Sequence, residues 1–214
     1  MKNLFTLLTI FIAVTASAQK LTPVELKQFR LREDPLKKFG YEIVRGKDAA
    51  VRFRSDSNFT RILVRAIIQD KSFQYPFDSL RCLSKLVAPD DRFRIFTWNL
   101  STNDETFHQY GVIQLNPEKW SKKELEANGN KLIFPLIDRS DFIRNPYDTI
   151  TNNDMWWGAL YYKMAKTQCK KISFYTLIGF DAYTAKSNRK VVDVLYFKDG
   201  QPVFGAPVFD VKGE

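Results

Sequence analysis

Residues 171–209 read KISFYTLIGFDAYTAKSNRKVVDVLYFKDGQPVFGAPVF, and this stretch decides the fold. Apolar and aromatic residues dominate three segments of it, 171–180, 190–197 and 201–209, and the pair Asp199-Gly200 separates the last two. Such segments are typical of β-strands, and a glycine-containing pair between two of them predicts a tight hairpin turn. Because the links are short, the three segments predict neighbouring antiparallel strands.

Five segments further upstream have the same character and bring the expected number of strands to about eight. These segments are 80–87, 92–100, 107–115, 131–137 and 156–166. Several strands, 191–197 among them, carry apolar side chains on both faces, as in a sheet that is covered on both sides. We therefore expect a mainly antiparallel β meander that is curved or barrel-like.

A helix is expected before the first strand. Thr22 and Glu25 have the spacing of a capping box, and Pro23 occupies the first helical position, where a missing N–H costs nothing. The pattern predicts a helix that runs to about Arg32 and ends before Pro35, since the residue before a proline avoids the helical conformation.

A second helix is expected over residues 58–70, where apolar residues recur every three or four positions. Asp48 is a competent N-cap, so an earlier start is open, and a short capped helix is expected at Ser121. Together these elements predict an α+β fold in which N-terminal helices pack on the antiparallel β meander.

Residues 1–18 have the composition of a secretory signal peptide. Lys2 gives a positive start, an apolar run from Leu4 to Val14 follows, and Ala16-Ser17-Ala18 supplies the small residues of a cleavage site. The run is shorter than the ~20 residues of a membrane-spanning helix. We expect an exported protein, periplasmic or extracellular, with no transmembrane segment after cleavage. We expect one domain to follow, in which a helical segment, 19–79, packs on the meander, 80–214.

Charge and motifs narrow the expected partners. The signal peptide carries one lysine and no acid, so its removal lowers the net charge from +9 to +8. Such a balance suits acidic partners, for example anionic lipid headgroups or acidic glycans, although solubility alone also explains it. The basic residues form no run of the kind found in nucleic-acid arms, so no nucleic-acid partner is expected. Phosphate, dinucleotide and calcium-binding motifs are missing, and we expect no cofactor.

The two cysteines, Cys82 and Cys169, lie in stretches expected to be strands. An oxidising compartment permits a disulfide between them, and two separate buried thiols are equally open.

Catalytic signatures are sparse. His108 is the only histidine in the sequence, which excludes a zinc site made of several imidazoles of one chain. The acids Asp154, Asp181 and Asp193 lie in or beside apolar strands, and they are weak candidates for paired-carboxylate chemistry if they converge in one cleft. Turn, capping and cross-strand hydrogen bonds are the alternative roles for them.

Four aromatic residues, Trp156, Trp157, Tyr161 and Tyr162, are candidate binding residues, because flat rings stack on the apolar faces of sugars. Neighbouring residues of a strand point to opposite faces, so only one of each adjacent pair can face a ligand. Packing in the core is the alternative role for these side chains.

Several runs along the chain are familiar as a set: 75–80 (YPFDSL), 88–99 (APDDRFRIFTWN), 157–162 (WGALYY), 175–181 (YTLIGFD) and 200–209 (GQPVFGAPVF). Together they resemble a group of uncharacterised exported proteins of Gram-negative bacteria, over most of the chain after residue 18. The resemblance implies export and a single folded unit, and it carries no known activity, cofactor or site residue.

The sequence therefore favours a non-catalytic binding or envelope-associated module, whose partner is an envelope protein or a glycan. The alternative is a hydrolase that acts on a glycan or similar polymer through paired carboxylates.

Overall fold

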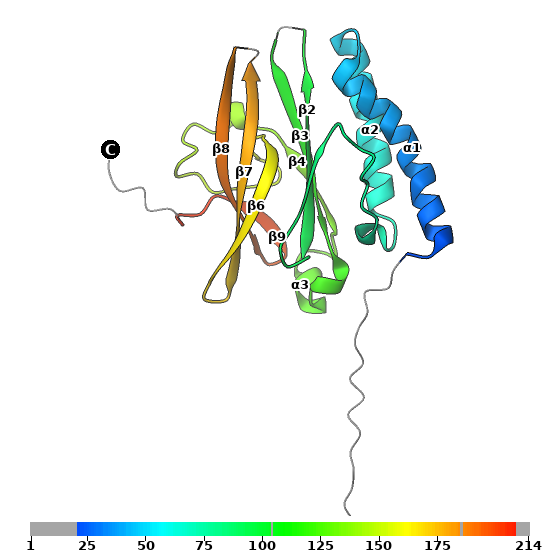
Figure 1. Cartoon of the computed structure of the whole chain (residues 1–214). Coiled ribbons are helices and arrows are strands. Elements are labelled where there is room, and N and C mark those ends of the chain that lie inside the picture. The colour runs from blue at the N-terminus through cyan, green and yellow to red at the C-terminus, as the bar shows by residue number, and fades with distance from the viewer. Residues whose placement is uncertain (1–20, 104, 185, 209–214) are drawn as a thin grey trace, which may run out of the picture.

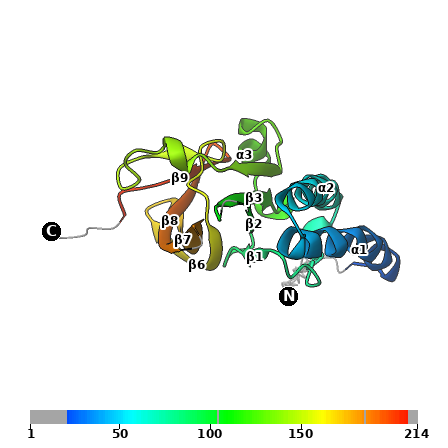
Figure 2. The same cartoon turned by 90° about the horizontal axis from the view of Figure 1, so that it is seen from above.

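The computed structural model describes residues 21–103, 105–184 and 186–208, and the expected signal peptide lies outside these ranges. The described chain forms three layers: a pair of helices, a four-stranded sheet A and a five-stranded sheet B (Figures 1 and 2). Among the described residues, no helix has the length and apolar character needed to cross a bilayer.

The helical layer consists of α1 (Pro23–Arg45) and α2 (Ala49–Ile67). The capping box expected at the start of α1 is confirmed: Thr22 accepts a bond from the Glu25 N–H, and the Glu25 side chain bonds back to the Thr22 N–H. Asp48 caps α2, so the earlier of the two open starts for the second helix is the one observed.

The prediction that the first helix ends before Pro35 is wrong, because α1 continues for ten residues beyond the proline. Pro35 removes one backbone donor, but Leu31, whose carbonyl loses that partner, is exposed, so water can bond the carbonyl instead. Beyond the proline, Leu36 and Ile43 are buried among residues of α2 and sheet A. This burial holds the second half of the helix in place.

All described strand pairs in the two sheets are antiparallel. Sheet A has the order β1-β2-β3-β4, and its strands are β1 (Ser84–Val87), β2 (Phe93–Ser101), β3 (Phe107–Leu115) and β4 (Ile133–Ile137). Sheet B has the order β5-β9-β8-β7-β6, and its strands are β5 (Thr151–Asn152), β6 (Leu160–Cys169), β7 (Ile172–Thr184), β8 (Ser187–Lys198) and β9 (Gln201–Phe204).

The expected α+β class, with N-terminal helices packed on an antiparallel meander, is confirmed. The meander divides into two sheets that pack face to face, and the described strands do not close into a barrel. A third helix, α3 (Lys122–Ala127), lies in the link between β3 and β4. Three short 3-10 helices complete the fold: η1 (Ser72–Gln74), η2 (Pro117–Lys119) and η3 (Ser140–Phe142).

Two hydrophobic cores separate the three layers. Between the helices and sheet A lie buried side chains such as Phe59, Leu63 and Trp98. Between the two sheets lie others such as Phe93, Tyr175 and Leu195. Sheet A is thus buried on both faces, whereas sheet B packs on sheet A with one face and presents the other outward.

Candidate functional site

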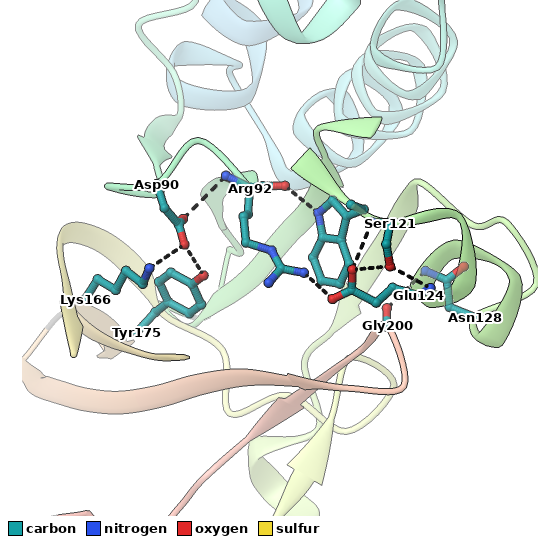
Figure 3. Close-up of polar contacts among 9 residues, drawn as sticks. Asp90, Arg92, Ser121, Glu124, Asn128, Lys166, Tyr175 and Gly200 are labelled. Atoms are coloured by element: carbon teal, nitrogen blue, oxygen red, sulfur yellow. Dashed lines mark hydrogen bonds and ion pairs between the residues drawn. The ribbon is translucent and has the colours of Figure 1, made fainter. Parts of the chain in front are cut away.

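A small cavity lies between α3 and the end of sheet B that carries the β8–β9 turn. Its volume is about 240 Å³, and its lining includes Arg92, Trp120, Glu124, Ser173, Tyr175 and Phe197. We call it the α3 pocket. Figure 3 shows polar contacts of residues in and around this pocket.

The short helix α3 is fixed at both ends. At its start, Ser121 and Glu124 form a capping box, as the sequence predicts. At its other end, the side-chain amide of Asn128 donates to the Gly200 carbonyl over 3.1 Å. Asp199 and Gly200 both have positive φ, 50° and 70°, as a two-residue hairpin turn requires. The expected turn is therefore confirmed, and it also contacts the C-terminal end of α3.

Arg92 forms the back of the pocket. Its guanidinium carbon lies 3.9 Å from the centre of the Trp120 ring, and the indole N–H donates to the Arg92 carbonyl over 2.8 Å. Arg92 Nη2 donates to Glu124 Oε1 over 2.7 Å (Figure 3). Partial burial disfavours the Glu124 carboxylate, but hydrogen bonds from Ser121 and Arg92 outweigh this effect and hold its pKa below the usual range. The pocket therefore contains a charged donor beside a charged acceptor.

One N–H group of Arg92 makes no hydrogen bond. Arg92 Nε is buried and has no hydrogen-bond partner. Among the described residues it is the one buried, unpartnered side-chain atom that belongs to a charged group. The other three such atoms are Thr60 Oγ1, Gln74 Oε1 and Gln109 Oε1. Burying a guanidinium N–H without a partner is costly, so an acceptor atom that reached it would be stabilised. Because Nε is buried, a ligand in the pocket reaches it only if a neighbouring side chain moves.

A second ionic group lies behind Tyr175, a residue that lines the pocket on the side of sheet B. Asp90 Oδ2 accepts from the Tyr175 hydroxyl over 2.8 Å and lies 2.9 Å from Lys166 Nζ (Figure 3). Partial burial opposes the charge on Asp90, yet the bonds from Lys166 and Tyr175 bring its pKa below the usual range. Burial and the Asp90 carboxylate raise the pKa of Tyr175, which stays a neutral hydroxyl.

Asp90 lies in the turn between β1 and β2, where it accepts from the Arg92 N–H over 3.4 Å. Its contacts with Lys166 and Tyr175 on sheet B are additional, and sequence reasoning missed them. The residues lie 76 and 85 positions from Asp90 along the chain, and no local pattern joins them. Arg92 and Glu124 were missed for the same reason.

The three acids proposed for catalysis each have their own structural partners. Asp154 is exposed in the turn after β5 and accepts from the Asn153 side chain. Asp181 on β7 accepts from Gln109 over 3.4 Å. Asp193 on β8 accepts from the Tyr161 hydroxyl and from the Val194 N–H, each over 2.8 Å.

Asp181 and Asp193 both face sheet A, and burial raises the pKa of each carboxyl. Asp193 pairs with Leu177, four residues from Asp181, so the two acids lie about 13 Å apart along the strand direction at about 3.3 Å per residue. That separation exceeds the ~5–9.5 Å between the two carboxyl groups of glycosidases. None of the three acids lines the α3 pocket.

In each pair of candidate aromatic residues, one side chain is buried and the other is not, although Trp156 and Trp157 lie before β6, which begins at Leu160, and Tyr162 lies at a β-bulge. Trp156 and Tyr161 are completely buried, and the Trp156 indole donates to the Tyr161 hydroxyl over 2.8 Å. Trp157 is half-buried, and Tyr162 is 49 % exposed on sheet B. Core packing therefore accounts for one member of each pair.

Cys82 and Cys169 are both free thiols. Cys82 lies in the turn before β1, not in a strand, and Cys169 is exposed at the end of β6, not buried. The thiol of Cys82 packs against Gly40 of α1, and burial raises its pKa to about 11.

A larger groove, of about 890 Å³, runs between the link after α2 and the ends of β1 and β3, and three of its basic groups, Arg94, Lys71 and Lys85, are already engaged, while Lys119 is exposed. Arg94 is 1 % exposed and donates to the carbonyls of Ser72 and Tyr75 and to the Gln114 side chain. Lys71 and Lys85 pair with Glu25 and Asp78. The α3 pocket is the better candidate because it retains an unsatisfied charged donor.

No protein-family model matches the chain, and no curated protein or solved structure matches it either. Within the described ranges, no group of three or more His, Cys, Asp and Glu side chains is placed to hold a metal ion.

Proposed function

We propose that the protein is an exported, non-catalytic binding module that takes one sugar unit of a glycan in the α3 pocket. The observation that carries the proposal is the unpartnered Arg92 Nε beside the Glu124 carboxylate. A hydroxyl group can accept from Nε–H and donate to Glu124 at the same time, because it is both a donor and an acceptor. An anion has no proton to give to Glu124, so the pair favours a neutral hydroxyl over a second carboxylate.

The apolar part of the pocket supports a sugar ring in the same place. Phe197 lies with its ring centre 4.9 Å from that of Trp120, and Ser173 adds a further hydroxyl. A cavity of about 240 Å³ is smaller than the ~300–1,000 Å³ typical of pockets for drug-sized ligands. This size suits one ring of a chain whose remainder lies outside.

Export is part of the proposal and rests on the composition of residues 1–18 and on the likeness to exported proteins of Gram-negative bacteria. A glycan or an envelope protein is the partner that this compartment offers. The rival proposal, a hydrolase acting on a glycan or similar polymer, has less support, since Asp154, Asp181 and Asp193 are engaged separately and two of them are too far apart for paired catalysis.

Isothermal titration of the protein lacking residues 1–18 tests the proposal. The ligands are methyl glycosides of hexoses and N-acetylhexosamines, together with their short oligomers. We expect at least one of them to bind in the millimolar range or tighter. Arg92→Lys removes Nε–H, and we expect binding to weaken at least about tenfold, the loss typical of a charged hydrogen bond.

Arg189→Lys is the matched control. Arg189 also stacks on a ring, that of Tyr183 at 3.7 Å, and pairs with Asp181 at 4.0 Å, but it lies outside the pocket. A second variant, Glu124→Gln, keeps the capping box while it removes the charged acceptor. The proposal fails if no glycoside binds, or if Arg92→Lys and Arg189→Lys bind the ligand equally well.

A further inference from the structure

The face of sheet B that points away from sheet A carries exposed apolar side chains that no other element of the described chain covers. Strand pairing defines the two faces, since Tyr175, Leu177 and Leu195 point into the core between the sheets. Side chains at alternate positions point the other way. We use the name outward face for the following positions: 163, 165 and 167 on β6; 172, 174, 176, 178 and 180 on β7; 190, 192, 194, 196 and 198 on β8.

Apolar side chains occupy most of this face, and several are exposed. Ile172 is 48 % exposed and Val192 60 %, while Phe174, Ile178 and Tyr196 are half-buried. A β-bulge between Tyr161 and Lys163 places Tyr162, 49 % exposed, beside them. A cluster of exposed apolar side chains is typical of a surface that contacts a partner.

The charges on the outward face have one sign. Lys163, Lys190 and Lys198 are all exposed, and no Asp or Glu occupies any of its positions. The two acids of the central strands, Asp181 and Asp193, both point to the opposite side, toward sheet A. The face is therefore complementary to an anionic partner.

Lysine and aromatic rings are combined locally. Lys190 Nζ lies 5.4 Å from the centre of the Tyr162 ring and 5.5 Å from that of Phe180. Tyrosine and lysine together are typical of protein surfaces at the boundary between lipid headgroups and acyl chains, where ring and stem meet apolar groups and the ammonium meets phosphate.

The size of the face argues against a second protein as the occupant. Five outward positions on β7 span about 26 Å, and three strands are about 15 Å wide, which gives roughly 400 Å². A stable protein–protein interface buries about 800 Å² on each partner. A lipid surface needs no such minimum, because attraction of several lysines to anionic headgroups adds to modest apolar burial.

We propose that the outward face of sheet B binds an anionic lipid surface. Lys163, Lys190 and Lys198 meet the headgroup phosphates, and Tyr162, Ile172 and Val192 enter the headgroup layer. The two sites meet at Ile172, which also lines the α3 pocket, but Lys163, Lys190 and Val192 lie outside that pocket, so variants at these three positions test the lipid surface separately. Bound in this way, the protein would lie with α1 and α2 directed away from the lipid (Figure 2).

Co-sedimentation of the protein lacking residues 1–18 with lipid vesicles tests this inference. We expect binding to vesicles of one part phosphatidylglycerol and two parts phosphatidylcholine, and little binding to phosphatidylcholine alone. Binding should fall as salt rises from about 0.05 M to about 0.5 M, as the Debye length shortens below the reach of the lysines. The double variant Lys163→Glu/Lys190→Glu should bind at least about tenfold more weakly.

The control changes the same net charge on the opposite side of the molecule. Lys27 and Lys38 are exposed on α1, and Lys27→Glu/Lys38→Glu should bind nearly as well as the unaltered protein. Val192→Asn tests the apolar contribution without a change of charge and should weaken binding without unfolding, since this side chain is 60 % exposed. Equal losses in the two double variants would show that overall charge, not this face, drives adsorption, and would overturn the inference. Retention on poly-glutamate without retention on vesicles would overturn it as well, in favour of an acidic protein.

Discussion

The guanidinium carbon of Arg92 lies over the ring of Trp120, 3.9 Å from its centre, while the Trp120 indole N–H donates to the Arg92 carbonyl. The Arg92 side chain thus contacts the face of the Trp120 ring, and the Arg92 backbone carbonyl binds the N–H at the edge of that ring. A stacked arginine on tryptophan is among the stronger cation–π pairs, and the hydrogen bond fixes its geometry. The back of the α3 pocket is therefore formed before any ligand arrives, which lowers the entropic cost of binding.

The contact between Gly200 and α3 predicts a large cost for a methyl group at this position. A Cβ on Gly200 would lie 2.6 Å from the Glu124 carbonyl oxygen, and the residue has a φ of +70°. Gly200→Ala should therefore lower the free energy of unfolding by about 2–4 kcal/mol, through backbone strain plus displacement of α3. Urea unfolding followed by circular dichroism measures the loss.

Gly129→Ala is the matched control for this variant. Gly129 has a similar φ of +73°, but no atom lies within 4 Å of its added Cβ. Its variant should cost only the backbone strain, about 1 kcal/mol. If the two alanine variants lose the same stability, the packing of α3 on the β8–β9 turn contributes nothing.

Local patterns determined most of the elements in advance. The capping boxes at Thr22 and Ser121 and the Asp199-Gly200 turn require residues only a few positions apart, and each is observed. The course of α1 through Pro35 could not be foreseen in this way, because the burial that outweighs the proline comes from α2 and sheet A.

The candidate site was harder to predict from the sequence, because its contacts also join residues that are far apart along the chain. Arg92 was expected only as part of a strand, and the residues that contact Arg92 and Asp90, namely Trp120, Lys166 and Tyr175, come from distant segments. The two-residue strand β5 was not predicted either, because two residues, Thr151 and Asn152, are too few to show an alternating pattern.

The buried hydroxyl of Tyr161 connects two otherwise separate polar groups. It accepts from the Trp156 indole and donates to Asp193, both over 2.8 Å. Tyr161→Phe leaves the indole N–H and one carboxylate oxygen without that partner, so it should reduce the free energy of unfolding by about 2–3 kcal/mol. Tyr162→Phe, on the next residue but 49 % exposed, should change it by less than about 0.5 kcal/mol. Similar losses for both variants in denaturant titrations would contradict the assigned hydrogen bonds.

The two free thiols should react at very different rates. Cys169 is exposed, whereas burial holds the pKa of Cys82 at about 11 and keeps its thiolate scarce near neutral pH. Titration of the folded protein with a chromogenic disulfide reagent should therefore show one fast and one slow thiol, and both should react at once in denaturant. Cys169→Ser should remove the fast phase alone. Detection of no thiol in denaturant would instead reveal a disulfide between the two cysteines.

The buried carboxyl of Asp56 should make the free energy of unfolding depend on pH. Its side chain is 5 % exposed on α2 and accepts from the Trp98 indole over 2.7 Å. Burial raises its pKa to about 6, although the bond from Trp98 opposes the shift. Between about pH 4 and pH 6 the folded state therefore binds more protons at this carboxyl than the unfolded state, whose pKa is about 4. By linkage, the contribution of Asp56 to stability decreases as the pH rises through this interval.

Asp56→Asn keeps an acceptor for the indole and carries no charge at any of these pH values. At pH 4 the variant and the unaltered protein should differ little, and by pH 7 the variant should be more stable by about 2–3 kcal/mol. Urea unfolding of both proteins at pH 4, 5, 6 and 7 gives the difference, in which the titration of all other groups cancels. A ¹³C NMR titration of the Asp56 carboxyl provides the independent check, with a midpoint near 6. A difference that stays constant with pH would show that Asp56 is ionised at the same pH in the folded and unfolded states.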